Sequence, residues 1–112
     1  MRKLDLTNYT FSFRKPDGTY QIATYDVKTT IVGIITHTQL RMNDYEMLEI
    51  DPLADKIESV KGDEVLLTEG EYRQMMRQFR KFTGYGNNDR PLLKRLRDCP
   101  EVQGEDISFS KS

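Results

Sequence analysis

The sequence predicts a small α+β domain in which an N-terminal β-hairpin packs with three to five helices, the last two forming a helix-turn-helix-like pair. Residues 9–24 show two β-rich runs separated by a reverse-turn signal. From residue 43 onward, apolar residues recur at helical spacing behind two capping boxes. A chain of 112 residues suffices for one core. We therefore expect a single domain over residues 1–101, with residues 102–112 as a C-terminal tail that is an edge strand or disordered.

The predicted hairpin has the period-2 pattern of a half-buried strand. Its first strand alternates polar residues with Tyr9, Phe11 and Phe13. The pair Asp17-Gly18 in "KPDGT" is a strong turn signal. Tyr20 and Ile22 are then expected to line the return strand.

Residues 27–36 fit two structures. Their β-branched content favours a strand. Helical spacing is equally visible, since Asp26 is a suitable N-cap and four apolar residues follow at the right intervals: Val27, Ile31, Ile34 and Ile35. We prefer a short buried helix, with a strand as the open alternative.

A helix is predicted from residue 43, where Asn43 and Glu46 form a capping box. Pro52 suits the first turn of a second helix, which allows the segment to break there. Gly62 is the predicted C-cap. A short strand follows in "EVLL", residues 64–67.

The clearest helix is predicted over residues 68–83, behind a capping box of Thr68 and Glu71. One side is apolar, over an arc of about 120°, and consists of Tyr72, Met75, Met76, Phe79 and Phe82. Gly84 and Gly86 end it in a flexible turn. A last helix is expected over residues 89–98, with Leu92, Leu93 and Leu96 turned inward.

Charge is divided sharply along the chain, although the net charge is only -1. Residues 43–71 contain ten acidic and two basic residues, whereas residues 72–97 contain eight basic residues and one acid. Such a division can bring like molecules together head to tail or present two faces to different partners. The alternative is that the two blocks neutralise one another within one fold.

These charges supply the candidate binding residues. The basic set is Arg73, Arg77, Arg80, Lys81, Arg90, Lys94 and Arg97, and the acidic partner face is Glu46, Glu49, Asp55 and Glu58. Arginine is favoured at protein interfaces because its planar fork pairs bidentately with carboxylates. We therefore expect a non-enzymatic protein-binding or assembly protein, whose partner is another copy in a homo-oligomer or a different protein.

Two other functions use the same residues. The alternative is a nucleic-acid-binding accessory protein that uses the basic face of residues 73–97. The sequence pI of about 5.8 and the long turn "TGYGNN" count against it. A phosphate ligand held by Tyr85 and arginines ranks lowest.

Catalytic constellations are missing from the sequence. His37 and Cys99 are each the only residue of their type, and we expect both to be structural. We predict no enzymatic activity, no metal site and no cofactor. One cysteine fits a reducing compartment, and neither a secretory signal nor a membrane-spanning run is evident, so a cytoplasmic location is expected.

The segments "YDVKTTIVGII", "DEVLLTEGEYRQMMRQF" and "GYGNNDRPLLKRL", spread over about residues 25–96, resemble small accessory or virion-assembly proteins of tailed bacteriophages. The resemblance implies a tail or virion assembly component, or a host-interaction factor. The implied partners are phage or host proteins, and the implied location is the host cytoplasm or the virion.

Overall fold

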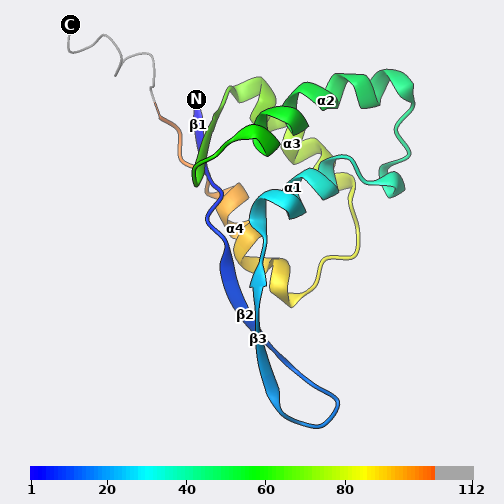
Figure 1. Ribbon diagram of the computed structural model, residues 1–112. Coiled ribbons are helices and arrows are strands. Elements are labelled where there is room, and N and C mark those ends of the chain that lie inside the picture. The colour runs from blue at the N-terminus through cyan, green and yellow to red at the C-terminus, as the bar shows by residue number, and fades with distance from the viewer. Residues whose placement is uncertain (103–112) are drawn as a thin grey trace, which may run out of the picture.

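Two small antiparallel sheets and four α-helices make up the described part of the chain, so the predicted α+β class is confirmed (Figure 1). The computed structural model describes residues 1–102. In chain order the elements are β1 (Arg2–Asp5), β2 (Tyr9–Arg14), β3 (Tyr20–Tyr25), α1 (Val27–Ile35), α2 (Asp44–Ser59), β4 (Glu64–Leu67), α3 (Glu69–Lys81) and α4 (Arg90–Arg97), with 3₁₀ turns η1 (Thr38–Leu40) and η2 (Asn87–Asp89).

Strand β1 was not predicted from the sequence. It pairs antiparallel with β4, so that Leu4 lies opposite Val65 and Arg2 opposite Leu67. Leu4 and Leu67 are completely buried. Only Leu4 of the four β1 residues is fully apolar, which is too short a pattern to predict a strand without its partner.

The hairpin β2–β3 is confirmed, and Tyr9 and Phe11 of its first strand pack against the core as predicted, but the residues predicted to line the return strand are wrong. Directly paired residues share a face of the ribbon. The register pairs Tyr9 with Tyr25, so this pair faces the core. Tyr20 and Ile22 lie on the other face and are each 71% exposed. Only the base of the hairpin packs on the body, and its far end projects away from it (Figure 1).

Helix α1 resolves the ambiguity of residues 27–36 in favour of a helix. The Asp26 carboxylate accepts a hydrogen bond from the backbone N–H of Thr29 at 3.1 Å, as an N-cap does. The four apolar residues predicted to form its inner stripe are all buried. Burial of this stripe against α2 and α3 outweighs the β propensity of its residues.

Helix α2 runs without a break from Asp44 to Ser59, so the expected interruption at Pro52 does not occur. Pro52 is exposed, and water can reach the carbonyl of Leu48 that loses its helical partner. The predicted C-cap is also wrong, because Val60 takes that position and Gly62 lies beyond it.

Helices α3 and α4 are close to the predicted ranges. Thr68 and Glu71 form the predicted capping box, and α3 ends at Lys81. The Gln78 amide is buried between helices and donates to the carbonyl of Ile35 at 3.1 Å, a contact not predicted from the sequence. In α4, Leu92 and Leu96 are fully buried and Leu93 is half-buried.

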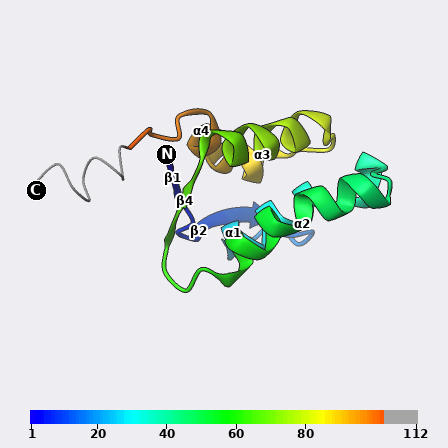
Figure 2. The same cartoon turned by 90° about the horizontal axis from the view of Figure 1, so that it is seen from above.

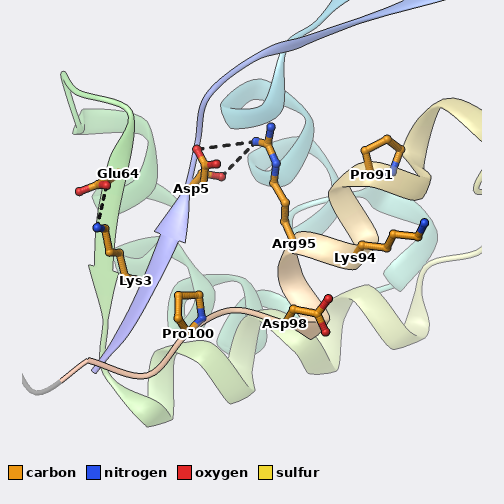
Figure 3. Close-up of a pocket in the computed structure, with 8 residues that line it drawn as sticks. All are labelled: Lys3, Asp5, Glu64, Pro91, Lys94, Arg95, Asp98 and Pro100. Carbon is orange, nitrogen blue, oxygen red and sulfur yellow. Dashed lines mark hydrogen bonds and ion pairs between the residues drawn. The ribbon is translucent and has the colours of Figure 1, made fainter.

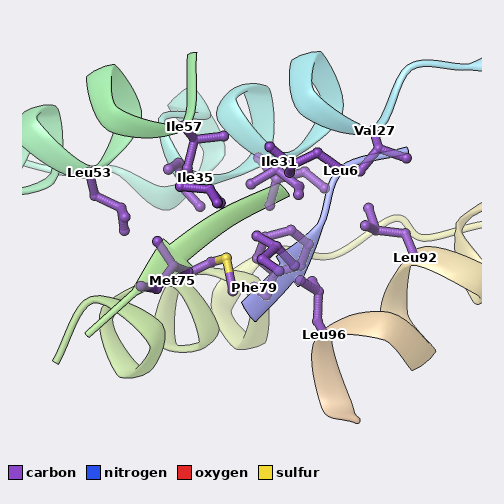
Figure 4. Packing of buried hydrophobic residues seen from close by; sticks show 14 of the residues in the cluster. Leu6, Val27, Ile31, Ile35, Leu53, Ile57, Met75, Phe79, Leu92 and Leu96 are labelled. Atoms are coloured by element: carbon purple, nitrogen blue, oxygen red, sulfur yellow. The ribbon is translucent and has the colours of Figure 1, made fainter. Parts of the chain in front are cut away.

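One hydrophobic core joins all four helices to both sheets (Figure 4). Figure 4 shows Ile31 and Ile35 of α1 near Ile57 of α2, with Met75 and Phe79 of α3 on the facing side. The turned view shows the α2 and α3 ribbons as separate layers, with the strands toward one end (Figure 2). The core therefore fixes α3, the main candidate binding helix, from its inner side.

Arg2 ties both ends of the described chain to α3. Its guanidinium donates to Glu69 Oε1 at 2.6 Å and to the carbonyl of Cys99 at 2.8 Å, and lies 4.5 Å from the centre of the Tyr72 ring. The hydrogen bond from Arg2 lowers the pKa of Glu69.

The segment after α4 continues beside β1, since the N–H of Val102 donates to the carbonyl of Met1 at 2.7 Å. The rest of the expected C-terminal tail, an edge strand or a disordered segment, lies outside the described residues.

The Lys56–Glu71 pair predicts an acid-dependent loss of stability. Lys56 Nζ lies 2.7 Å from Glu71 Oε1, which also accepts from the N–H of Thr68. Burial raises the pKa of Glu71, but these hydrogen bonds outweigh it, and the pKa is lowered overall. The stabilising contribution is therefore present above the unfolded value of about 4.3 and is lost as pH falls through the folded pKa.

We expect Glu71→Gln, which can keep the capping box, to reduce the free energy of unfolding by about 0.5–1 kcal/mol at pH 7 and to flatten its fall between about pH 5 and 3. Urea unfolding at a series of pH values measures both. Glu58→Gln, at an exposed carboxylate on α2, is the matched control and should retain the wild-type fall. If the free energy of unfolding of Glu71→Gln fell with pH as steeply as that of the wild type, Glu71 would not be the group responsible for the loss of stability in acid.

Candidate protein-binding surface

Helix α3 presents four exposed cations on the side opposite its buried residues. At about 100° per residue, Arg73, Arg77, Arg80 and Lys81 fall within an arc of about 100°, centred roughly opposite Met75 and Phe79. We call these four residues the α3 cation row. The sequence prediction placed them on one face, and the helix of the structure does the same.

No member of the α3 cation row forms an ion pair with another residue in the range 1–102. The five pairs found there use other basic residues, namely Arg2–Glu69, Lys3–Glu64, Lys56–Glu71, Arg95–Asp5 and Arg97–Asp98. None of the five joins the acidic block 43–71 to the basic block 72–97. Direct pairing within the described chain therefore does not neutralise the two blocks.

The α3 cation row carries an energetic cost within the isolated chain. Like charges four residues apart, such as Arg73 with Arg77 and Arg77 with Lys81, destabilise a helix by about 0.2–0.5 kcal/mol per pair. Arg80 and Lys81 lie in the last turn, where the helix dipole favours positive charge. That effect does not reach Arg73, which lies in the first half of α3, although its charge contributes to lowering the pKa of Glu69 four residues before it. A role in folding therefore explains only part of the row.

The acidic face splits between two sides of α2. Glu46 and Glu49 line a shallow hollow together with Arg77 and Lys81, where the Gln74 amide crosses from α3 to the carbonyl of Glu49 at 3.1 Å. Asp55 lies about 180° around the helix from Glu46, and Glu58 is displaced by about 120°. The expectation of a single acidic face is thus wrong, because its residues do not share a helical period.

The basic residues of α4 are also divided from those of α3. Lys94 borders a different hollow, of about 640 Å³, between α4, β1 and the segment at Pro100 (Figure 3). Arg97 is paired with Asp98 through two hydrogen bonds of 2.8 and 3.0 Å. Arg90 is exposed. The predicted basic surface is therefore not one continuous patch along α3 and α4, although the α3 part is intact.

The hollow beside α4 has a balanced lining. Three bases and three acids border it: Lys3, Lys94, Arg95, Asp5, Glu64 and Asp98. Lys3 pairs with Glu64 at 3.0 Å, and Arg95 donates to the carbonyl of Thr7 at 2.6 Å. Figure 3 shows Lys3 directed toward Glu64 and Arg95 toward Asp5, whereas Lys94 extends away from both pairs. The lining charges balance in number, and two of the three bases are paired within the lining, so the hollow has no excess charge to attract an anionic or cationic ligand.

The connection between α3 and α4, residues 82–89, is fixed by three tyrosine hydroxyls. Tyr9 donates to the carbonyl of Asn88 at 2.6 Å, Tyr25 to Asp89 Oδ1 at 2.5 Å and Tyr85 to the carbonyl of Phe79 at 2.7 Å. Burial raises the pKa of Tyr85 to about 12. Because its hydroxyl is already engaged, Tyr85 is a poor anchor for the phosphate of the lowest-ranked function.

His37 and Cys99 have structural contacts. The Nδ1 atom of His37 accepts from the N–H of Gln39 at 3.1 Å and caps η1, while its ring packs edge-on against Phe82. Cys99 is buried beside β1, where its thiol contacts the carbonyl of Lys3 at 3.3 Å. Burial raises the pKa of the Cys99 thiol, which disfavours the reactive thiolate.

Metal-ligating residues do not gather in the described region: residues 1–102 contain no cluster of three or more His, Cys, Asp or Glu side chains able to hold an ion. Over the same span, none of the helices has the length and apolar character needed to cross a membrane.

No protein-family model, curated protein or solved structure matches this chain. The candidate function therefore rests on the geometry and charge of the surface itself.

The tyrosine contacts predict that the base of the hairpin stabilises the α3–α4 connection. We expect Tyr25→Phe, which removes the hydroxyl and retains the stacked ring, to lower the free energy of unfolding by about 1.5 kcal/mol. Amide exchange at residues 86–89 should also become faster. Denaturant unfolding and hydrogen exchange measure the two effects.

The matched control is Tyr20→Phe, at an exposed tyrosine of the projecting end. It should leave both the unfolding free energy and the exchange of residues 86–89 unchanged. Equal effects of the two substitutions would show that the Tyr25 hydroxyl has no special part in holding the connection.

Proposed function

We propose that this chain is a non-enzymatic protein-binding protein of an assembly, and that the α3 cation row contacts an acidic surface of a protein partner. The observation that carries the proposal is the row itself: four exposed cations on one helix face, without ion partners in the portion of the chain that the structure describes. Arginine forks suit carboxylates, and three of the four residues are arginines.

The rigid packing of α3 on the core favours binding through the α3 cation row. Met75 and Phe79 anchor the inner side of α3 in the core, and a capping box fixes its first turn. The backbone positions of the cations are therefore set before a partner arrives, which reduces the entropy lost on association. Glu46 and Glu49 border one side of the row and would repel a partner whose acidic surface extended across it.

The partner class follows from charge and from the resemblance to tailed-bacteriophage proteins. We infer a partner that is a phage or host protein, or another copy of this chain, in tail or virion assembly or in host interaction. The corresponding location is the host cytoplasm or the virion. The resemblance of pattern is the support for this setting.

Nucleic-acid binding is the second candidate, because an exposed row of cations on a helix also suits phosphates. Three observations disfavour it. The hollow that contains Arg77 also contains two glutamates, the cations of α4 do not extend the row, and the sequence pI is about 5.8.

We expect the dissociation constant for a random-sequence 20-base-pair duplex to be weaker than about 10⁻⁴ M at physiological salt, which is below ordinary non-specific affinity. Fluorescence anisotropy of a labelled duplex measures it. A dissociation constant near 10⁻⁶ M that Arg73→Gln/Arg77→Gln weakens would favour the nucleic-acid function and overturn the proposal.

The protein-binding function predicts opposite effects on binding and stability. Arg73→Gln/Arg77→Gln should abolish copurification of protein partners from nuclease-treated lysate of the cells in which the chain is naturally made. The free energy of unfolding should stay the same or rise by about 0.2–0.5 kcal/mol, because like-charge repulsion along α3 is relieved.

The matched control is Arg41→Gln/Lys61→Gln, which removes the same charge from exposed positions outside α3. It should retain the partners. Loss of the same partners in both double variants would attribute capture to overall charge, and would reject α3 as the binding surface.

A further inference from the structure

Large exposed apolar side chains gather at two places in the structure. Three belong to the projecting end of the hairpin: Phe13, Tyr20 and Ile22. Three others lie in the first turns of α2: Tyr45, Met47 and Leu48. Leu66 of β4 is the only other one between residues 1 and 102. Single exposed apolar residues are ordinary, but clusters of this kind mark interaction surfaces.

The projecting end of the hairpin is apolar on both faces. Tyr20 and Ile22 are each 71% exposed and share one face, opposite Arg14 and Ser12. Phe13 lies on the other face, opposite Gln21. A two-stranded ribbon without further cover is only marginally stable in water. Its apolar end therefore gains from packing against another surface.

The first turns of α2 form a second apolar patch on the side away from the core. Tyr45 and Leu48 are 73% and 71% exposed, whereas Ile50 and Leu53 of the same helix are 2% exposed. Tyr45, Leu48 and Glu49 together line a shallow depression of about 230 Å³. Glu49 belongs to the predicted acidic partner face, but Tyr45 and Leu48 were not among the residues predicted to bind.

The two patches have opposite charge. On the surface of α2, Asp44, Glu49 and Asp51 flank Tyr45 and Leu48, whereas Glu46 lies toward Arg77 and Lys81 of α3. The hairpin turn carries Arg14 and Lys15, and its one acid, Asp17, accepts hydrogen bonds from the backbone and hydroxyl of Thr19 at 2.9 and 2.7 Å. Each patch thus combines apolar area with a charge that suits the other.

One copy of the chain cannot bring its own two patches together. In Figure 1 the hairpin projects at the bottom, whereas the first turns of α2 lie at the upper right of the body. The hairpin of one copy can instead reach the α2 patch of another. A contact between different surfaces of identical chains is heterologous, and it builds a ring or an open chain of copies.

We propose that this protein self-associates head to tail, with the hairpin end of one copy docked on the α2 patch of the next. Phe13, Tyr20 and Ile22 cover Tyr45 and Leu48, and Arg14 and Lys15 meet the surrounding carboxylates. The α3 cation row takes no part in this contact, so the contact does not rest on the function proposed above, although Glu49 also borders the hollow that contains Arg77 and Lys81.

Sedimentation velocity of the full chain tests the contact. Between about 10 µM and 1 mM at low salt, we expect the sedimentation coefficient to rise with concentration, and association to weaken as salt is added. Ile22→Asp and Leu48→Lys should each weaken association at least about tenfold. Leu66→Asp, which alters the exposed apolar residue outside both patches, is the matched control and should associate as the wild type does.

Mixing identifies the head-to-tail geometry. Ile22→Asp keeps an intact α2 patch, and Leu48→Lys keeps an intact hairpin, so an equimolar mixture should form a dimer that grows no further. Charge exchange gives a second test: Arg14→Glu/Lys15→Glu and Glu49→Lys/Asp51→Lys should each weaken association, and a mixture of the two double variants should restore it. Circular dichroism checks that every variant is folded.

A wild-type chain that remains monomeric at 1 mM at both salt concentrations would overturn the proposal and assign the two patches to a different protein. So would association that Ile22→Asp and Leu48→Lys leave intact. Ile22→Asp and Leu48→Lys alter neither the α3 cation row nor the glutamates beside it, so neither result bears on the duplex-binding and partner-capture experiments above.

Discussion

The pairing of β1 with β4 is the constraint on which the rest of the structure depends. It buries Leu4 and Leu67 completely and brings the N-terminus beside the start of α3, where Arg2 contacts Glu69 and Tyr72. The segment after α4 then lies along the same strand and receives the hydrogen bond from Arg2 to the Cys99 carbonyl. Both ends of the described chain are therefore held by one ladder. This leaves α3 anchored at its first turn and along its buried side, while the cations on its opposite side have no ion partner among residues 1–102.

This arrangement separates stability from interaction. The inner sides of the helices meet in one core, and buried polar groups such as the Gln78 amide have partners there. In the part of the chain that the structure describes, no buried side-chain nitrogen or oxygen lacks a hydrogen bond. By contrast, the α3 cation row has no ion partner there, and the hairpin end has no apolar cover. Unpaired cations and exposed apolar side chains, which do not stabilise a folded monomer, are thus concentrated on three surfaces: the α3 cation row, the hairpin end and the α2 patch. Such a concentration is typical of a chain that works by binding.

The two proposed contacts differ in their physical basis. The α3 cation row offers charge and directional hydrogen bonds on a rigid helix, so its affinity should depend on the carboxylate geometry of a partner. The hairpin and the α2 patch combine apolar area with opposite charge, so they suit a persistent contact between copies. A chain with both can form an assembly through one pair of surfaces and recruit another protein through the third. In both proposals the division of acidic and basic residues along the sequence is used for intermolecular contacts, which agrees with the absence of direct ion pairs between the two blocks within residues 1–102.

The sequence by itself determined the α+β class, the capping boxes, the hairpin turn and the cationic side of α3, because each depends on residues close together along the chain. Local spacing sufficed to place Arg73 and Arg77 opposite Met75 and Phe79. Only the tertiary structure decided that β1 exists, that Tyr20 and Ile22 point away from the core, that α2 passes through Pro52, and that the predicted acidic face divides. Those outcomes depend on strand register, on which side of a helix meets the core and on contacts between residues more than 60 positions apart, such as Arg2 with Glu69. Local patterns carry no information about such long-range pairing, since the partner is fixed only when the core closes.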